Sequence, residues 1–333
     1  MSDEQPTTNA PTAASAEAPA AAPANPVDDG PRCGSIALIG RPNAGKSTLM
    51  NHLLAEKLAI VSRRPQTTRN RIVGILSEAR GQVIVLDTPG VHKPQHRMNK
   101  RMLKAAHDAL ADADVVCLLH DAEQPFGGGD RYMVEWLAEV AQPRIALLNK
   151  IDRIADKRAL LPRIATYAEA GFDEILPVSA RTGAGCDTLL DLVFARLPVA
   201  PPRYDPELIT IHPERFLVAE RIREKLLERL RDELPFATAV VLEHWQQKGP
   251  NLIVLHASIL VERPSQKRIV VGKQGSMIRA LGTAAREDLE AYLESKVFLE
   301  LNVRVQTDWR EDPRVLDALE RAPSDVSNLL DGG

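Results

Sequence analysis

The segment from residue 36 to residue 55 constrains the fold of this chain more than any other. Its first four residues are apolar, and a glycine-bearing loop then leads through Lys46 and Ser47 into a helix-permissive segment. A strand that ends in such a loop and continues as a helix directs consecutive backbone N–H groups at one point, which suits a di- or triphosphate. The sequence therefore predicts a phosphate-binding loop, Gly40-Arg41-Pro42-Asn43-Ala44-Gly45-Lys46-Ser47.

In such a loop we expect Lys46 to reach the β- and γ-phosphates and Ser47 to bind magnesium. The remaining nucleotide contacts are predicted at Gly40, Asn43, Ala44, Gly45 and Thr48. The alternative is an ordinary strand-to-helix turn that matches the pattern by chance.

Composition divides the chain into a tail and two folded parts. The 333 residues are 44% hydrophobic, which supports more than one core. Residues 1–30 contain five acidic residues and no Lys or Arg, and their Ala/Pro-rich composition predicts disorder. Neither a secretory nor an organellar targeting signal fits this acidic start. No apolar run approaches the roughly 20 residues that span a bilayer, and the three cysteines, an odd number without metal-ligand spacing, indicate reduced thiols in a cytosolic protein.

Apolar runs recur along the first half of the chain, separated by charged segments that permit helices. Runs that are apolar throughout indicate strands buried on both faces, and hence a parallel sheet covered by helices. An alternating segment, Thr68 to Leu76, predicts an edge strand. Ligands of such sheets bind at the carboxyl ends of the strands. The predicted buried strands are residues 36–39, 83–86, 115–119, 145–148 and 175–178.

Polar residues follow three of these strands. After residue 86 come Asp87, Thr88 and Gly90, where a carboxylate could hold magnesium through water and a glycine N–H could contact the γ-phosphate. A turn-forming Asp-Thr-Pro-Gly is the alternative. After residue 178 come Ser179 and Ala180, which could place a backbone N–H on a guanine carbonyl or could simply cap a helix.

The residues after position 148 predict which nucleotide base the site binds. We expect the aliphatic stem of Lys150 to cover a purine and the Asn149 amide to meet its edge. Asp152 is an acceptor-only carboxylate, so it requires two adjacent donors, which guanine offers and adenine does not. These tetrapeptides are weak signals singly, but in this order at strand ends they predict a guanine-nucleotide site.

With these residues, the segment 35–198 resembles a translation-factor-class small GTPase, a P-loop NTPase domain. The loop sequence, Ser62 to Arg69 and the Asp-Thr-Pro-Gly segment are similar to the TrmE-Era group. The resemblance implies GTP/GDP with Mg²⁺ bound through Ser47, Asp87 and a switch I threonine. The position in the sequence favours Thr68 as this magnesium ligand, and Thr67 remains the alternative. It also implies catalytic roles for Lys46, Thr68, Gly90 and Asn43.

Val91 occupies the place where Ras-like enzymes carry a water-orienting glutamine. Valine cannot orient water, so slow intrinsic hydrolysis is expected. In the resembled group the loop asparagine, here Asn43, is associated with a K⁺ ion that replaces an arginine finger. The alternative is that Val91 packs and that His92 or His96 orients the water.

Beyond a proline-rich linker, the chain predicts a smaller α+β domain. Its elements are an amphipathic helix near 214–232, strands at 237–244 and 252–261, a short strand at 268–271, a helix through Ser295 and a strand at 297–305. The Gly-x-x-Gly loop between the short strand and the helix resembles that of a bacterial-type (type II) KH domain, which clamps a nucleic-acid backbone. Residues 262–286 carry six basic residues and one acidic residue, the charge expected of a phosphate-binding face. The predicted RNA contacts are Gly272, Lys273, Gln274, Gly275, Lys267, Arg268 and Arg279, with a tight turn and a solvated helix face as alternatives.

A GTPase domain followed by a KH domain resembles the Era family of bacterial GTPases over residues 34–320. This resemblance implies binding to the 3′ end of 16S ribosomal RNA and to the small (30S) ribosomal subunit during its maturation. It further implies a cytoplasmic monomer with peripheral contact at the inner membrane, and an RNA or ribosome contact by Thr307 to Asp312. The alternative for this segment is a strand and helix that close the domain, in which Trp309 simply packs. The rival functions are a tRNA-modification GTPase of the TrmE kind and an RNA-binding protein that uses GTP as a structural ligand. The predicted segments are a tail (1–31), a GTPase domain (32–200), a linker (201–207), a KH domain (208–310) and a C-terminal tail (311–333).

Overall fold

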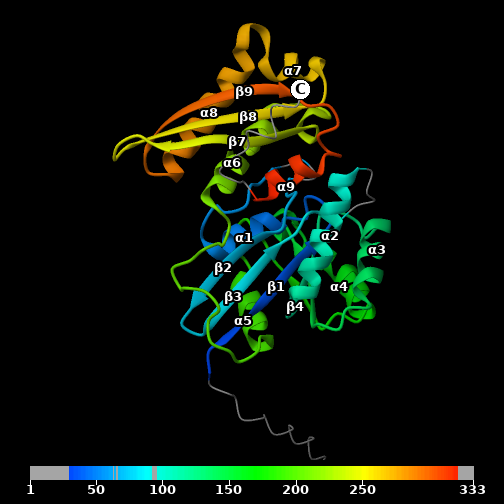
Figure 1. The fold of residues 1–333 in the computed structure, drawn as a ribbon. Helices are drawn as coiled ribbons and strands as arrows, with labels where there is room; N and C mark the ends of the chain where they lie inside the picture. The colour runs from blue at the N-terminus through cyan, green and yellow to red at the C-terminus, as the bar shows by residue number, and fades with distance from the viewer. Residues whose placement is uncertain (1–29, 63, 65–66, 92–95, 322–333) are drawn as a thin grey trace, which may run out of the picture.

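The computed structural model describes residues 30–62, 64, 67–91 and 96–321. Two sheets form the cores of two units, with the longer sheet in the first half of the chain (Figure 1). Residues 1–29 of the predicted tail, and the candidate water-orienting His92, lie outside the described residues.

The larger sheet has six strands in the order β2-β3-β1-β4-β5-β6. Neighbouring strands are parallel except for β2, which pairs with β3 antiparallel at the edge of the sheet. The predicted parallel sheet with an edge strand is therefore present, although the edge strand begins at residue 72 instead of 68 and its burial does not alternate, since its first four residues are all buried. The strands are β1 (Arg32–Gly40), β2 (Ile72–Glu78), β3 (Gly81–Asp87), β4 (Val115–Asp121), β5 (Arg144–Asn149) and β6 (Glu174–Pro177).

Helices cover both faces of this sheet, so each strand contributes to two apolar cores. On one face α1 and α5 pack through residues such as Met50 and Leu189. On the other, α2, α3 and α4 pack through Ala106, Met133 and Tyr167. Burial on both faces explains why these strands are apolar throughout. The helices are α1 (Lys46–Leu54), α2 (Arg97–Asp112), α3 (Gly128–Leu137), α4 (Leu161–Glu169) and α5 (Cys186–Arg196).

The connection to the second unit runs along the edge strand β2. The Ile75 N–H donates to the Ile209 carbonyl at 2.8 Å, and the Val73 N–H donates to Nε2 of His212 at 3.0 Å. An uncovered edge strand is a template for association with other chains. The segment that joins the two units therefore also covers the edge of β2 and prevents its association with other chains.

The smaller sheet has the order β7-β8-β9, with β7 antiparallel and β9 parallel to β8. The predicted strand at 268–271 is wrong, because these residues belong to helix α7. Pro264 stands in the first turn of that helix, and the Gln266 side chain accepts from the Glu262 and Arg263 N–H groups at 2.8 and 3.1 Å. This capping outweighs the strand preference of the β-branched residues. The elements are α6 (Glu214–Arg229), β7 (Thr238–Gln247), β8 (Leu252–Val261), α7 (Pro264–Val271), α8 (Ser276–Tyr292) and β9 (Lys296–Val305).

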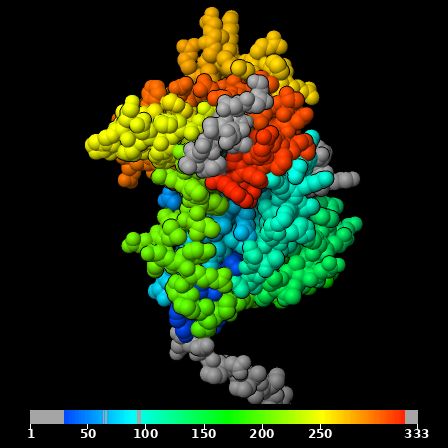
Figure 2. Space-filling view, in the orientation of Figure 1, coloured from blue at the N-terminus to red at the C-terminus, as the bar shows by residue number. Residues whose placement is uncertain are grey.

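A further helix, α9 (Pro313–Arg321), lies where the sequence predicted part of a C-terminal tail. Its buried Val315 and Leu316 pack with Met98 and Met102 of α2 and with Trp309. It lies between the two units, as the red segment in Figures 1 and 2. Within the segment Thr307 to Asp312, the Trp309 indole is fully buried and donates to the Ala237 carbonyl at 3.1 Å, which fits the alternative that Trp309 packs.

The three cysteines are buried and free of disulfides. Within the described ranges, every helix is too short or too polar to cross a membrane.

Candidate nucleotide site and nucleic-acid interface

A cavity of about 860 Å³ lies at the carboxyl end of the larger sheet. Its wall includes the phosphate-binding loop from Arg41 to Thr48 together with Thr68, Gly90 and Lys150. Residues at the end of β4 and in the segments after β1, β3 and β5 meet at this edge because these four strands are parallel, and the sequence predicted site residues after β1, β3 and β5.

The backbone of the loop requires glycine at the position directly before helix α1. Gly45 has φ +99°, and a Cβ there would lie 2.2 Å from Nδ2 of Asn149. Helix α1 begins at the next residue and has no side-chain cap. The first N–H groups of the helix therefore face the cavity side of the loop, where an anion can satisfy them.

Lys46 is buried beneath this loop. Its Nζ donates to the carbonyl oxygens of Gly40 and Arg41, each at 3.2 Å. Burial lowers the pKa of this ammonium group, and the nearby Asp87 carboxylate opposes that shift. A phosphate oxygen would supply the negative charge that this buried cation lacks.

The predicted magnesium ligands lie within hydrogen-bonding distance of one another. Ser47 Oγ is 2.6 Å from Oδ2 of Asp87 and 2.8 Å from Oγ1 of Thr68, which is itself 3.2 Å from the same carboxylate oxygen. Thr67 is turned away, with its hydroxyl donating to the Arg64 carbonyl at 2.8 Å. The geometry therefore favours Thr68, the choice that sequence position favoured.

Asp87 also carries an orphaned atom. Its Oδ1 is buried without a hydrogen-bond partner among the described residues. Burial raises the pKa of this carboxyl, while Lys46 and the two hydroxyls oppose the shift. One carboxylate beside two hydroxyls fits Mg²⁺, which binds few protein oxygens and completes its shell with phosphate and water.

The base-recognition residues differ from the expectation in two respects. The N–H groups of Ser179 and Ala180, one of which was expected on the guanine carbonyl, donate instead to the Ala184 carbonyl at 2.8 Å and to Oδ1 of Asn149 at 2.9 Å. Asn149 was expected to meet the base edge, but its Nδ2 donates to the Ala44 carbonyl at 2.7 Å and its Oδ1 accepts from the Ala180 N–H at 2.9 Å. The side chain thus ties the phosphate loop to the segment after β6. Asp152 accepts from Ser179 Oγ at 2.7 Å, and this hydrogen bond lowers the pKa of the carboxyl. Lys150 pairs with Asp121 at 2.6 Å.

Asp121 is a site residue that the sequence reasoning missed. It ends β4 and lines the cavity. The rule applied to Asp87, a carboxylate directly after an apolar strand, did not find it, because His120 separates Asp121 from the apolar run at 115–119. Thr88, in contrast, is buried and donates to the Leu38 carbonyl at 2.7 Å, which ties β3 to β1.

Of the residues considered for water activation, Val91 and His96 lie in the described part of the chain. Val91 is buried in the core on the α2 side. His96 stands at the start of α2, with Nδ1 3.5 Å from Oε1 of Glu311. An ion pair with that carboxylate would hold the imidazole toward the second unit.

The Gly-x-x-Gly segment joins α7 to α8 and has exposed basic residues on both sides. Gly272 and Gly275 both have φ +75°. Arg279 donates to the Gln274 carbonyl at 2.6 Å, so α8 fixes the tip of the loop. The exposed predicted RNA contacts are Lys267, Arg268, Lys273, Gln274 and Arg279.

Family models match both units. The model described as 50S ribosome-binding GTPase matches residues 35–150, and the KH domain model matches residues 233–310. GTPase Era of Heliobacterium modesticaldum is 44% identical over 286 residues, covering 86% of this chain and 95% of the relative. GTPase Era of Geobacter metallireducens is 45% identical over 290 residues, covering 86% and 97%.

Two solved structures are similar over 88% of this chain and all of theirs, each at 34% identity. A variant of Aquifex aeolicus Era bound to GDP·AlF₄⁻ gives a TM-score of 0.84. Era in complex with MgGDPNP and nucleotides 1506–1542 of 16S ribosomal RNA gives 0.85. With its GTPase and KH domains in this order, the chain belongs to the GTPase Era family.

Proposed function

We propose that this chain binds and hydrolyses GTP, and that its KH domain binds the 3′ end region of 16S ribosomal RNA on the small (30S) ribosomal subunit during maturation. The observation that carries the first half is the cluster of Ser47, Thr68 and Asp87 with its orphaned carboxylate oxygen, beside the phosphate loop. The membership of the chain in the Era family supports both halves.

Each residue of the nucleotide site has a proposed part. Lys46 leaves the loop carbonyls to bind the β- and γ-phosphates. Ser47, Thr68 and Asp87 hold Mg²⁺, which neutralises phosphate charge when bound. Asp152 accepts from guanine, with Ser179 holding the carboxylate in place.

Hydrolysis is slow because Val91 lacks a group that orients water. We propose that Asn43 helps to hold a K⁺ ion, which stabilises charge that develops on the leaving phosphate. His96 is the rival for water positioning, and its position beside Glu311 favours a role at the domain boundary instead.

For RNA, the exposed basic residues of α7 and α8 supply phosphate contacts, and the Gly272 to Gly275 loop approaches the backbone. The relative solved with 16S ribosomal RNA supports this assignment. A map of crosslinked RNA from cells tests it. We expect crosslinks at the 3′ end of 16S RNA, and crosslinks spread over transfer RNA would support the rival tRNA-modification function.

Three further statements extend the proposal. The chain acts as a monomer, since one chain supplies all the nucleotide-site residues named above; sedimentation at working concentration tests this. It acts in the cytoplasm. Peripheral contact with the inner membrane rests on the family resemblance, and flotation with anionic vesicles checks it.

A further inference from the structure

The described part of switch I lies along helix α6 of the KH domain. We define switch I as residues 61–69, of which 61, 62, 64 and 67–69 are described. Its first residue, Val61, donates its N–H to Oε1 of Glu224 at 3.1 Å. Arg64 donates to the carbonyls of Leu227 and Leu230 at 2.8 and 2.5 Å, at the C-terminal end of α6. A guanidinium there satisfies carbonyls that a helix leaves unpaired.

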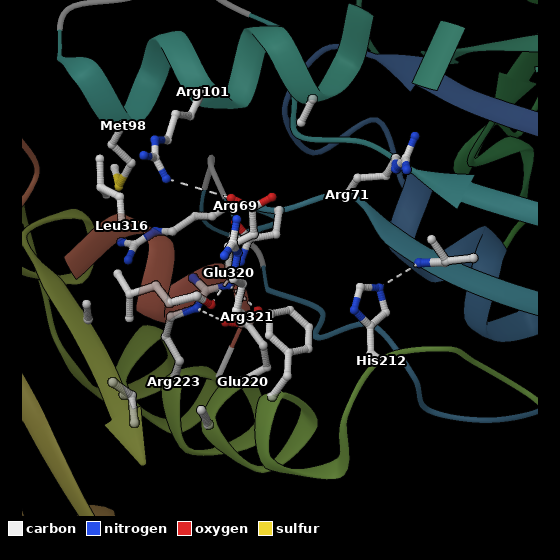
Figure 3. A pocket seen from close by; sticks show the side chains of 18 of the residues that line it. Arg69, Arg71, Met98, Arg101, His212, Glu220, Arg223, Leu316, Glu320 and Arg321 are labelled. Carbon is white, nitrogen blue, oxygen red and sulfur yellow. Dashed lines mark hydrogen bonds and ion pairs between the residues drawn. The ribbon is translucent and has the colours of Figure 1, made fainter. Parts of the chain in front are cut away.

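Two buried arginines tie the residues on either side of Thr68 to the KH domain. Arg223 of α6 donates from Nη2 to the Thr67 carbonyl. Arg69 donates from Nη1 to the Thr238 carbonyl at 2.7 Å and from Nη2 to the Pro235 carbonyl at 3.0 Å. In both cases one partner belongs to switch I and the other to the KH domain. Figure 3 shows Arg69 and Arg223 in the interdomain cavity.

Arg223 is itself fixed. Its Nε and Nη2 donate to the two carboxylate oxygens of Glu220, each at 2.7 Å, and the side chain is only 3% exposed. Arg69 is 8% exposed and lies 5.7 Å from the Trp309 ring centroid. Burying two guanidinium groups costs several kcal/mol each unless hydrogen bonds and partners compensate. Here the acceptors are mostly backbone carbonyls of switch I and of the KH domain, and the compensation is incomplete, because Nε of Arg69 and Nη1 of Arg223 are buried without a hydrogen-bond partner among the described residues.

These contacts also affect the predicted magnesium ligands Ser47, Thr68 and Asp87. With the preceding carbonyl and the following side chain both held, the backbone of Thr68 has little freedom to move away. In that position its hydroxyl is 2.8 Å from Ser47 Oγ. The contact made by Arg223 is to a backbone carbonyl, so it depends on where switch I lies and not on which side chain position 67 carries.

We propose that Arg223 is a positioning residue for GTP hydrolysis: from the KH domain it holds the Thr67 carbonyl and thereby keeps the Thr68 hydroxyl at the metal position, with Arg69 as the second point of attachment. The inference rests on the proposed function. It predicts a selective defect, because Thr68 is expected to join the metal only in the triphosphate state. Affinity for GDP should be unchanged.

A double-mutant cycle tests the proposal. For each variant we measure the single-turnover rate and the Mg²⁺-dependent affinity ratio of a non-hydrolysable GTP analogue over GDP. Arg223→Ala should lower both by about tenfold, the effect of one hydrogen bond from a charged donor. In a Thr68→Ala background the same change should have almost no further effect on the affinity ratio. Arg223→Lys, which retains a donor, should recover part of both losses.

The matched control is Arg229→Ala, which removes an exposed arginine from the last turn of the same helix. It should match wild type in both measurements. Thermal melting and GDP affinity of every variant separate positioning from unfolding, since a purely structural role for Arg223 would weaken GDP and GTP binding together.

An equal effect of Arg223→Ala with and without Thr68 would overturn the proposal, as would a wild-type affinity ratio in Arg223→Ala. These outcomes are distinct from failure of the proposed function, in which wild-type protein itself would not hydrolyse GTP.

Discussion

Replacing Asp152 with asparagine should convert a guanine-specific site into a xanthine-preferring one. The carboxylate is held by Ser179 Oγ at 2.7 Å and its side chain is 10% exposed. Two adjacent donors of guanine are expected to bond to it. An asparagine amide presents an N–H₂ group to the guanine amino group, so donor meets donor. Xanthine carries a carbonyl at that position and accepts from the amide.

The magnitude follows from the hydrogen bonds. A hydrogen bond to a charged group contributes about 1.5–3 kcal/mol, and the one from the guanine amino group is lost; the one from the ring N–H then meets a neutral acceptor worth about 0.5–1.5 kcal/mol, so the total cost is about 3 kcal/mol. At about 1.4 kcal/mol for each factor of ten, guanine nucleotide should bind at least about 100-fold more weakly. The exposed ion pair from Arg181 to the same carboxylate adds little, because its guanidinium is 67% exposed.

The assay is competition between a fluorescent nucleotide and unlabelled GDP or XDP. Asp156→Asn serves as the matched control, because Asp156 lies four positions further on, is exposed and bonds only locally to Arg158 in the described structure. It should keep guanine preference. If Asp152→Asn bound GDP and XDP equally well, the carboxylate would have no part in base recognition.

Three further predictions concern the ion, the connection and the RNA face. Exchanging K⁺ for Na⁺ should slow hydrolysis several-fold without weakening nucleotide binding, because the ion at Asn43 acts on the transition state; an unchanged rate would remove the ion from the mechanism. Burial lowers the pKa of His212 to about 4. Neutral His212 therefore makes its full contribution to the stability of the folded protein above about pH 6.5, and up to about 3 kcal/mol of that contribution is lost as pH falls toward 4. His212→Gln should flatten that loss in urea titrations, and an equally steep loss would assign it to other groups. Gly275→Asp should abolish RNA binding while GTP affinity stays intact, whereas Lys273→Ala should weaken all RNAs alike and reduce the salt slope by about one ion; undiminished RNA binding by a folded Gly275→Asp would place the RNA surface elsewhere.

The choice of the glycine variant comes from the structure. A Cβ at Gly272 would lie 2.7 Å from the backbone nitrogen of Met277, so a substitution there risks the fold. A Cβ at Gly275 would meet only Ile278, at 3.9 Å. Introducing negative charge at Gly275 alone therefore tests phosphate contact with less risk to folding.

The strands and the phosphate loop could be predicted because their determinants are local. An apolar run buried on both faces, or a glycine that must adopt a positive φ, is visible in a few adjacent residues. The segment ending at Val271 shows the limit of that reasoning. Its β-branched residues favour a strand, but Pro264 and Gln266 cap a helix, and the capping prevailed.

The roles of Asn149 and the arginines depended on contacts that no local pattern reveals. Asn149 Nδ2 bonds to Ala44, which is 105 positions away. Arg223 meets Thr67 across 156 positions. The first pair is set by how the sheet of the GTPase domain folds and the second by how the two domains dock, so spacing along the chain carries no signal for either.

The most direct test of the account is single-turnover hydrolysis of radiolabelled GTP with Mg²⁺, K⁺ and an RNA carrying the 3′ end of 16S ribosomal RNA. Wild-type protein should release phosphate slowly but well above the spontaneous rate, and Asp87→Asn, which removes the carboxylate beside Ser47 and Thr68, should fall to background. If wild-type protein bound GTP and the RNA tightly but released no phosphate, GTP would be a structural ligand and the proposed hydrolytic function would be wrong.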